Sequence, residues 1–200
     1  RRMVYQEQLA ASFHHVLREA DRLYAGGGRL EQAYRQLADR LRELGVAHAV
    51  VGGYALILHG VRRFTEDVDR LVTEEGLRRL RGALLGQGYT EIPGNARDIR
   101  HAATGVRIEF LVAGQYPGDG REKPVAFPDP AAAAVEIQGI RVVSLERLVE
   151  LKLASGMTAK GRLQDLADVQ RLIQIHCLTA AFADRLSPYV RETFVSLLER

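Results

Sequence analysis

The chain has 200 residues, of which 46% are hydrophobic and 26% charged, a composition typical of a globular domain with a sizeable core. Its net charge of +3 is small, and acids and arginines are mixed along the chain, so charge alone does not indicate nucleic-acid binding. No apolar run reaches the roughly 18 residues of a membrane span, and the single cysteine, Cys177, excludes an intrachain disulfide and a multi-cysteine zinc site. We therefore expect a cytoplasmic protein with no membrane partner, in which Cys177 is a small core residue.

The first half of the chain predicts helices around two short strands. Apolar residues at helical spacing predict helices at residues 4–24, at residues 30–44 and from Thr73 onward, with Thr73 as the N-cap. The β-branched run at residues 46–51 is expected as a buried strand, and EDVDRLV at residues 66–72 as the next strand. Between them, Gly52 and Gly53 turn the chain into a short helix.

The second half predicts further strands and then helices. Two or three strands are expected at residues 90–114, around turns at Pro93–Gly94 and Thr104–Gly105. An extended connection with a hairpin at Gln138–Gly139 follows, and from Ser144 the pattern is helical. The sequence thus predicts an α+β fold, a small mixed β-sheet with flanking and C-terminal helices. Its expected parts are an N-terminal helix (residues 1–28), a core (residues 29–143) and a C-terminal helical part of the same domain (residues 144–200).

Three acids suggest a cation site. Asp67 and Asp69 are two residues apart in the expected strand, so their side chains point to the same face. Carboxylates that close raise one another's pKa unless a cation compensates, and Mg²⁺ is commonly held by one or two carboxylates plus substrate phosphates. Glu109 faces away from the apolar side of VRIEFLV. If that strand lies beside the first, three acids converge and can bind two metals, which suits in-line displacement at phosphorus.

The glycine pair suggests where an anion could bind. A strand followed by Gly52, Gly53 and a helix presents free backbone N–H groups at a helix N-terminus. The alternative is a structural ion network, in which Asp67 caps a turn and Asp69 pairs with Arg62 or Arg63. Spacing alone does not decide between the two interpretations.

The run GGYALILHGVRRFTEDVDRLV resembles the signature of nucleotidyltransferases of the DNA polymerase β superfamily. It looks closest to the minimal and AbiEii-like bacterial members, whose motif reads approximately G-G-x-A, H-G, R-x-T-x-D-x-D. The matching positions are Gly52, Gly53, Ala55, His59, Gly60, Arg63, Thr65, Asp67 and Asp69. Later elements also resemble the family: a third acid, a lysine-bearing helix and a helix beginning R-x-x-D-x-x-D, which here are Glu109, Lys152, Arg162, Asp165 and Asp168.

This resemblance implies a nucleotidyltransferase core and an Mg²⁺-dependent enzyme, with Mn²⁺ as an alternative ion. Such an enzyme moves a nucleoside monophosphate from an NTP to an acceptor hydroxyl on tRNA, a protein or a small molecule such as an antibiotic. The resemblance implies Asp67, Asp69 and Glu109 as catalytic metal ligands, Gly52, Gly53, Arg63, Thr65 and Lys152 as nucleotide-binding residues, and Asp165 as support for Lys152. It also implies a toxin–antitoxin role with an antitoxin partner; a homo-oligomer is a further expectation.

Two departures from the family pattern bear on activity. Arg70 follows the second aspartate where family members usually have an apolar residue, and Glu109 stands where aspartate is common. The alternative function is therefore an inactive nucleotide-binding or interaction module with the same fold, although three retained acids favour an enzyme. A basic RNA-binding protein without enzymatic activity would need a basic stripe and aromatic platforms, and the sequence has neither.

Overall fold

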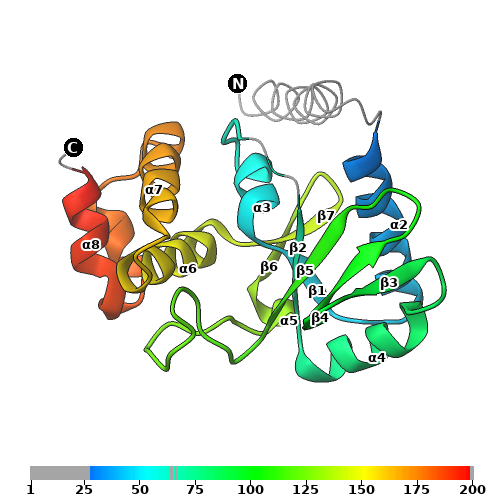
Figure 1. Ribbon diagram of the computed structural model, residues 1–200. Coiled ribbons are helices and arrows are strands. Elements are labelled where there is room, and N and C mark those ends of the chain that lie inside the picture. Colours follow the sequence, from blue (N-terminus) through cyan, green and yellow to red (C-terminus); the bar gives the residue numbers. More distant parts are fainter. Residues whose placement is uncertain (1–27, 64, 66, 199–200) are drawn as a thin grey trace.

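The computed structural model describes residues 28–63, 65 and 67–198. The predicted helix at residues 4–24, and with it nearly all of the predicted N-terminal part (residues 1–28), lies outside the described residues. A single seven-stranded sheet forms the centre of the molecule (Figure 1). The predicted α+β class, with a mixed sheet and flanking and C-terminal helices, is confirmed.

The sheet combines parallel and antiparallel pairs. Its strands are β1 (His48–Val50), β2 (Val68–Val72), β3 (Tyr89–Ile92), β4 (Asn95–His101), β5 (Arg107–Val112), β6 (Ala134–Ile137) and β7 (Ile140–Val143). Their order is β3-β4-β5-β2-β1-β7-β6. β2 runs parallel to β5, and β1 parallel to β7, whereas the other neighbours are antiparallel. The sheet thus brings together strands that are not consecutive in the chain.

Helices flank the sheet and make up the C-terminal part. They are α2 (Arg29–Glu43), α3 (Gly52–Leu58), α4 (Glu74–Leu84), α5 (Pro130–Ala133), α6 (Leu145–Thr158), α7 (Leu163–His176), the 3-10 helix η1 (Ala180–Arg185) and α8 (Pro188–Leu198). Thr73 and Ser144 cap α4 and α6, since their hydroxyls accept hydrogen bonds from backbone N–H groups of the first turns. Among the described helices, none is long and apolar enough to cross a membrane.

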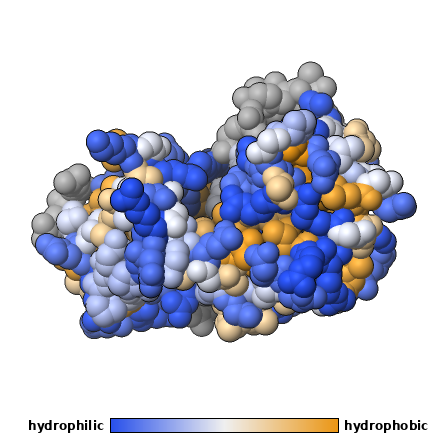
Figure 2. All heavy atoms as spheres, turned by 60° about the horizontal axis from the view of Figure 1, so that its bottom comes forward, coloured by the Kyte–Doolittle hydropathy of each residue, from blue (hydrophilic) through white to orange (hydrophobic). Residues whose placement is uncertain are grey.

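The two faces of the sheet differ in chemistry because side chains alternate along each strand. Val68, Ile108 and Phe110 are fully buried on one face of the sheet, the face on which Arg70 contacts Tyr34 of α2. Asp69 and Glu109 alternate with them and therefore point to the other face, where they line one cavity with Lys152 of α6 and Asp165 of α7. Seen from the bottom of Figure 1, the outer surface is mostly hydrophilic, with a smaller apolar area over the sheet part (Figure 2).

Two local expectations were wrong. The segment after Phe127 was expected to be extended, but it contains α5, because Asp129 accepts a hydrogen bond from the N–H of Ala131 at 2.7 Å and Pro130 occupies the first helical position. Cys177 is exposed, not part of the core, because it ends α7 in the left-handed conformation with φ 50°. The hairpin predicted at Gln138–Gly139 is confirmed by positive φ values of 54° and 75°.

Arg70 fills a place in the core on the face opposite the acids. Its side chain is fully buried, and its guanidinium carbon lies 4.3 Å from the centre of the Tyr34 ring, which in turn packs 4.8 Å from the ring of Tyr54. No hydrogen-bond partner within the described ranges reaches its three nitrogens. Burial accordingly lowers the pKa of Arg70. Arg70, which departs from the family pattern, therefore lies in the core on the face of the sheet opposite the acids.

We expect Arg70→Met to raise the free energy of unfolding by about 1 kcal/mol or more, because it removes buried N–H groups that lack partners and keeps most of the apolar volume. Chemical denaturation at pH 7.5 measures the change, with Arg121→Met on an exposed loop as the control. A destabilised Arg70→Met variant would show that the contact with Tyr34 outweighs the cost of burying N–H groups without partners.

Candidate active site

One cavity gathers the residues that the sequence singled out. Its volume is about 250 Å³, and it lies between the acid-bearing face of the sheet, the start of α3, and helices α6 and α7. Its lining includes all nine predicted site residues: Gly52, Gly53, Arg63, Thr65, Asp67, Asp69, Glu109, Lys152 and Asp165. The structure therefore brings together groups that lie up to 113 positions apart in the chain.

The acids meet because β2 and β5 are parallel neighbours. Asp69 is paired in register with Glu109, and Asp67 lies just before β2, two residues from Asp69. Burial raises the pKa of Asp69 to about 6, and the nearby carboxylates of Glu109 and Asp67 contribute to this rise, against a smaller opposing effect of the Gly53 N–H. The site thus holds a carboxyl group that is costly to ionise without a cation.

The glycine corner is shaped around Asp69. A Cβ on Gly52 would lie 1.9 Å from Oδ2 of Asp69, and the backbone there has φ +66°. The N–H of Gly53 donates to the same Oδ2 at 3.2 Å, while a Cβ on Gly53 would lie 2.9 Å from Oγ1 of Thr65. The sequence predicted these amides as phosphate donors. In this structure the Gly53 amide positions the carboxylate, and the missing side chains make room for Asp69 and Thr65.

A network of ion pairs holds two positively charged side chains that line the cavity. Nζ of Lys152 donates to Asp165 at 2.6 Å and forms an ion pair with Asp168 at 2.9 Å. Asp165 also accepts a hydrogen bond from the Ser155 hydroxyl at 2.7 Å, and the fully buried Asp168 also accepts one from the guanidinium of Arg63. The contact predicted between Asp165 and Lys152 is present. Asp165 and Asp168 therefore fix two positively charged side chains, Lys152 of α6 and Arg63 of the loop after α3, on one wall of the cavity.

The same network answers the alternative interpretation of the acids. Arg63 pairs with Asp168, not with Asp69. Within the part of the chain that the structure describes, no ion pair joins Asp67, Asp69 or Glu109 to a cation. Among the described residues, these carboxylates therefore lack the structural salt bridge that the scaffold interpretation required.

Two of the acids, Asp69 and Glu109, are suited to bind a hard cation, although the described acids do not form a complete metal site by themselves. Among the described residues, no three His, Cys, Asp or Glu side chains are grouped closely enough to hold an ion as they stand. Mg²⁺ needs only one or two carboxylates and takes its other ligands from water and phosphate. A cation between Asp69 and Glu109 would also relieve the repulsion that helps to raise the pKa of Asp69. These two donors suit Mg²⁺.

Sequence reasoning missed two parts of the site. It gave Asp168 no role. The signal was the helical spacing: Lys152 and Ser155 are three residues apart on one helix, and Asp165 and Asp168 are three residues apart on the next, so each pair lies on one helix face. It also missed the apolar part of the lining, which includes Leu111, Pro117, Phe127, Leu148 and Leu151. No motif marks these residues, because they reach the cavity only through the tertiary fold.

Known structures share this architecture. The solution structure of the antibiotic-resistance factor ANT(2'')-Ia matches with a TM-score of 0.53 at 13% identity, over 83% of this chain and 89% of that chain. A crystal structure of ANT(2'')-Ia in complex with adenylyl-2''-tobramycin gives a TM-score of 0.48 at 15% identity, over 77% and 97% of the two chains. An antigenic nucleotidyltransferase-like protein from Paracoccidioides brasiliensis gives 0.47 at 18% identity, over 75% and 78%.

Neither a protein-family model nor a curated protein sequence matches the chain significantly. The comparisons with solved structures nonetheless show that the chain has the nucleotidyltransferase fold, as the resemblance predicted.

We expect Gly52→Ala to destabilise the protein by about 2 kcal/mol more than Gly45→Ala. Gly45 has a similar positive φ of +61°, but a Cβ there would meet nothing within 4 Å, so this control isolates the clash with Asp69 from the backbone strain. Chemical denaturation measures both variants. In an Asp69→Ala background the excess cost of Gly52→Ala should largely disappear. An unchanged excess cost would show that the clash with Asp69 does not cause it.

We expect Asp69→Asn to raise the unfolding temperature at pH 7.5 by about 6–12 °C, because the amide needs no ionisation and still accepts the hydrogen bond from Gly53. Since the pKa of Asp69 is about 6 in the folded protein against an ordinary value of 3.8, wild-type stability should rise as pH falls through this interval. Thermal unfolding curves of wild type and variant should therefore converge near pH 4. The control is Asp184→Asn at an exposed position, and parallel curves for Asp69→Asn and wild type would contradict the raised pKa.

Proposed function

We propose that the protein is an Mg²⁺-dependent nucleotidyltransferase, which moves a nucleoside monophosphate from an NTP to an acceptor hydroxyl. The observation that carries the proposal is the in-register pairing of Asp69 with Glu109, in the same cavity as Arg63 and Lys152. Carboxylates without a cation partner favour a metal ion, and fixed cations favour phosphate oxygens. A metal–polyphosphate complex satisfies both at once.

The residues divide into two sets by charge. Asp67, Asp69 and Glu109 would hold Mg²⁺ or Mn²⁺, which when bound neutralises phosphate charge and polarises the reacting phosphoryl group. Arg63 and Lys152 bind the phosphate tail. Because aspartates already hold these two cations in place, little reorganisation is needed when negative charge develops on the leaving group.

The reaction is a single displacement at the α-phosphorus. The acceptor oxygen forms a bond to the α-phosphorus, and the bond from that phosphorus to the oxygen bridging to the β-phosphate breaks. Pyrophosphate leaves with the bonding electrons, and Arg63 and Lys152 stabilise its charge. The Glu109 carboxylate takes the proton of the acceptor hydroxyl, since Glu109 sits beside Asp69 on the neighbouring strand. The acceptor classes implied by the resemblance, tRNA, protein or small molecule, and the toxin–antitoxin setting belong to this proposal as expectations.

We expect the protein, incubated with Mg²⁺, a cell extract and each of the four α-³²P-labelled NTPs in turn, to transfer label to one fraction of the extract. Asp67→Asn and Asp69→Asn should each lower the transfer by at least about 100-fold, because each removes a metal ligand. The control Asp184→Asn should transfer label like the wild type. Transfer retained in Asp69→Asn would refute the site, whereas nucleotide binding without any transfer in the wild type would establish the inactive module instead.

A further inference from the structure

We propose that the acceptor carries a phosphate group, which binds to Arg100 and Arg107 beside Glu109. This assignment rests on the proposed function and adds to it the chemical class of the second substrate. Arg100 and Arg107 are called the acceptor pair below.

The sheet order indicates the side from which the acceptor arrives. The glycine corner at the start of α3 follows β1, and next to β1 in the sheet come β2 with Asp69, β5 with Glu109 and then β4. In an in-line displacement the leaving group and the attacking oxygen lie on opposite sides of the phosphorus. The pyrophosphate lies with the cations near the glycine corner in the proposed complex. The acceptor therefore approaches across Glu109, from the side of β5 and β4.

The acceptor pair occupies that side of the sheet. Arg107 precedes Glu109 by two residues on β5, and both side chains consequently point to the same face. Arg100 on β4 is the direct cross-strand partner of Arg107. Arg100 is exposed, and the side chain of Arg107 is 40% exposed. The Arg107 side chain thus shares a face with the proposed catalytic base, and Arg100 stands beside Arg107 within reach of solvent.

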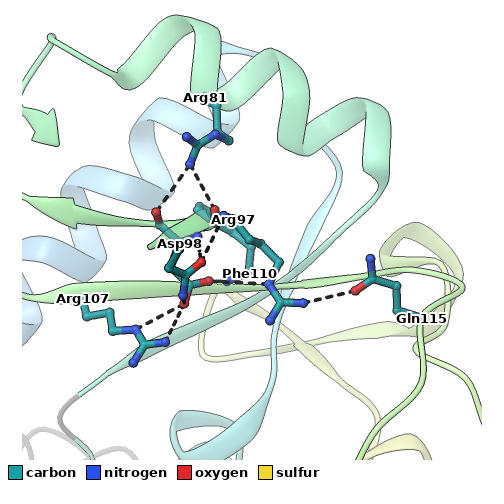
Figure 3. A network of polar contacts seen from close by, with 7 residues as sticks. Arg81, Arg97, Asp98, Arg107, Phe110 and Gln115 are labelled. Atoms are coloured by element: carbon teal, nitrogen blue, oxygen red, sulfur yellow. Dashed lines mark hydrogen bonds and ion pairs between the residues drawn. The ribbon is translucent and has the colours of Figure 1, made fainter. Parts of the chain in front are cut away.

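A buried aspartate holds Arg107 in place. Asp98 is fully buried on β4, and its Oδ2 accepts hydrogen bonds from Nε of Arg107 at 3.2 Å and Nη2 at 2.6 Å (Figure 3). The same carboxylate accepts from the Asn95 amide at 2.7 Å and from the N–H of Phe110 at 3.2 Å. The hydrogen bonds from Arg107 to Asp98 raise the pKa of Arg107. Arg107 is therefore a rigid, permanently charged group.

Both arginines keep donors for a ligand. Among the described residues, Nη1 of Arg107 has no partner, and Arg100 uses only Nη1, which donates to the carbonyl of Gly105 at 2.7 Å. A guanidinium presents its N–H groups in a planar fork that matches two oxygens of a phosphate. The free donors of the acceptor pair suit such an anion.

Charge on this side favours an anion over a cation. Arg97 adds a third guanidinium, whose Nη1 donates to the side-chain oxygen of Gln115 at 3.2 Å and whose Nε lies 3.7 Å from Asp98, so Arg97 and Arg107 share this one carboxylate. Glu91, on the edge strand β3, pairs with Arg81 of α4, which Figure 3 shows reaching β4 from the side opposite Arg107. Glu109 and Asp67 also act on Arg107 from the cavity side, but in the proposed complex these acids hold the metal ion. The arginines therefore attract a phosphate more than a polycationic acceptor such as an aminoglycoside.

A phosphate of this kind can belong to an RNA strand or to a phosphorylated small molecule, and binding measurements separate the two. The probes are a 5′-fluorescent 12-nucleotide RNA, followed by anisotropy, and glucose 6-phosphate and tobramycin, followed by calorimetry, all at 100 mM salt. We expect the wild type to bind at least one phosphate probe more tightly than tobramycin. RNA binding alone identifies a nucleic-acid acceptor, and glucose 6-phosphate binding identifies a small-molecule acceptor.

The diagnostic variant is Arg100→Glu, and its matched control is Arg79→Glu. Arg79 is also exposed and also donates to a backbone carbonyl, that of Leu44 at 2.6 Å, but it lies on α4. Arg100→Glu should weaken binding of the phosphate probe about tenfold, and Arg79→Glu less than twofold; for RNA, the slope of log affinity against log salt should fall by about 0.7. Arg107→Lys should weaken binding by a smaller factor, since it keeps a cation against Asp98.

Three results would overturn the assignment: tighter binding of tobramycin than of either phosphate probe, equal effects of Arg100→Glu and Arg79→Glu, or no measurable binding of either phosphate probe. The labelled transfer from NTP distinguishes this failure from failure of the proposed function. Transfer by the wild type that is unchanged in Arg100→Glu rejects only the acceptor assignment. Absence of transfer in the wild type rejects the enzymatic function.

Discussion

The parallel pairing of β2 with β5 places two carboxylates side by side in a partly enclosed cavity, and the rest of the site is arranged around that unfavourable contact. Asp69 and Glu109 repel each other, and burial makes the ionised state of Asp69 costlier still. Such an arrangement persists because the surrounding fold determines it. The apolar residues that alternate with the acids, such as Ile108 and Phe110, are locked in the core, so the acids cannot leave their face.

Two positively charged side chains of the same cavity have ion-pair partners, whereas Asp67, Asp69 and Glu109 do not have them among the described residues. Arg63 and Lys152 are each held by buried aspartates, at geometries that would be costly to break, because loss of one partner leaves an uncompensated buried charge. The acids have no such partner among the described residues. A site with fixed cations and uncompensated anions is suited to a ligand that carries both a metal ion and phosphates, which is what the proposed chemistry requires.

Local patterns explain how much could be predicted from the sequence. The turn at Gly52–Gly53, the alternation around Glu109 and the cap at Thr73 are fixed by neighbouring residues, and the structure has each of them. Two features were out of reach of local patterns. The contact of Arg63 with Asp168 joins residues 105 positions apart, and the burial of Arg70 follows from the packing of α2 on the back of the sheet. Family resemblance, not periodicity, linked the C-terminal helices to the site.

The most direct test of the shared metal–phosphate site is the thermal unfolding of the wild-type protein with Mg²⁺ alone, with an NTP alone and with both. If the carboxylates and the fixed cations bind one metal–nucleotide complex, the shift in unfolding temperature with both ligands will exceed the sum of the two separate shifts. Separate shifts that simply add, or no shift with any NTP, would contradict a common site for cation and phosphate.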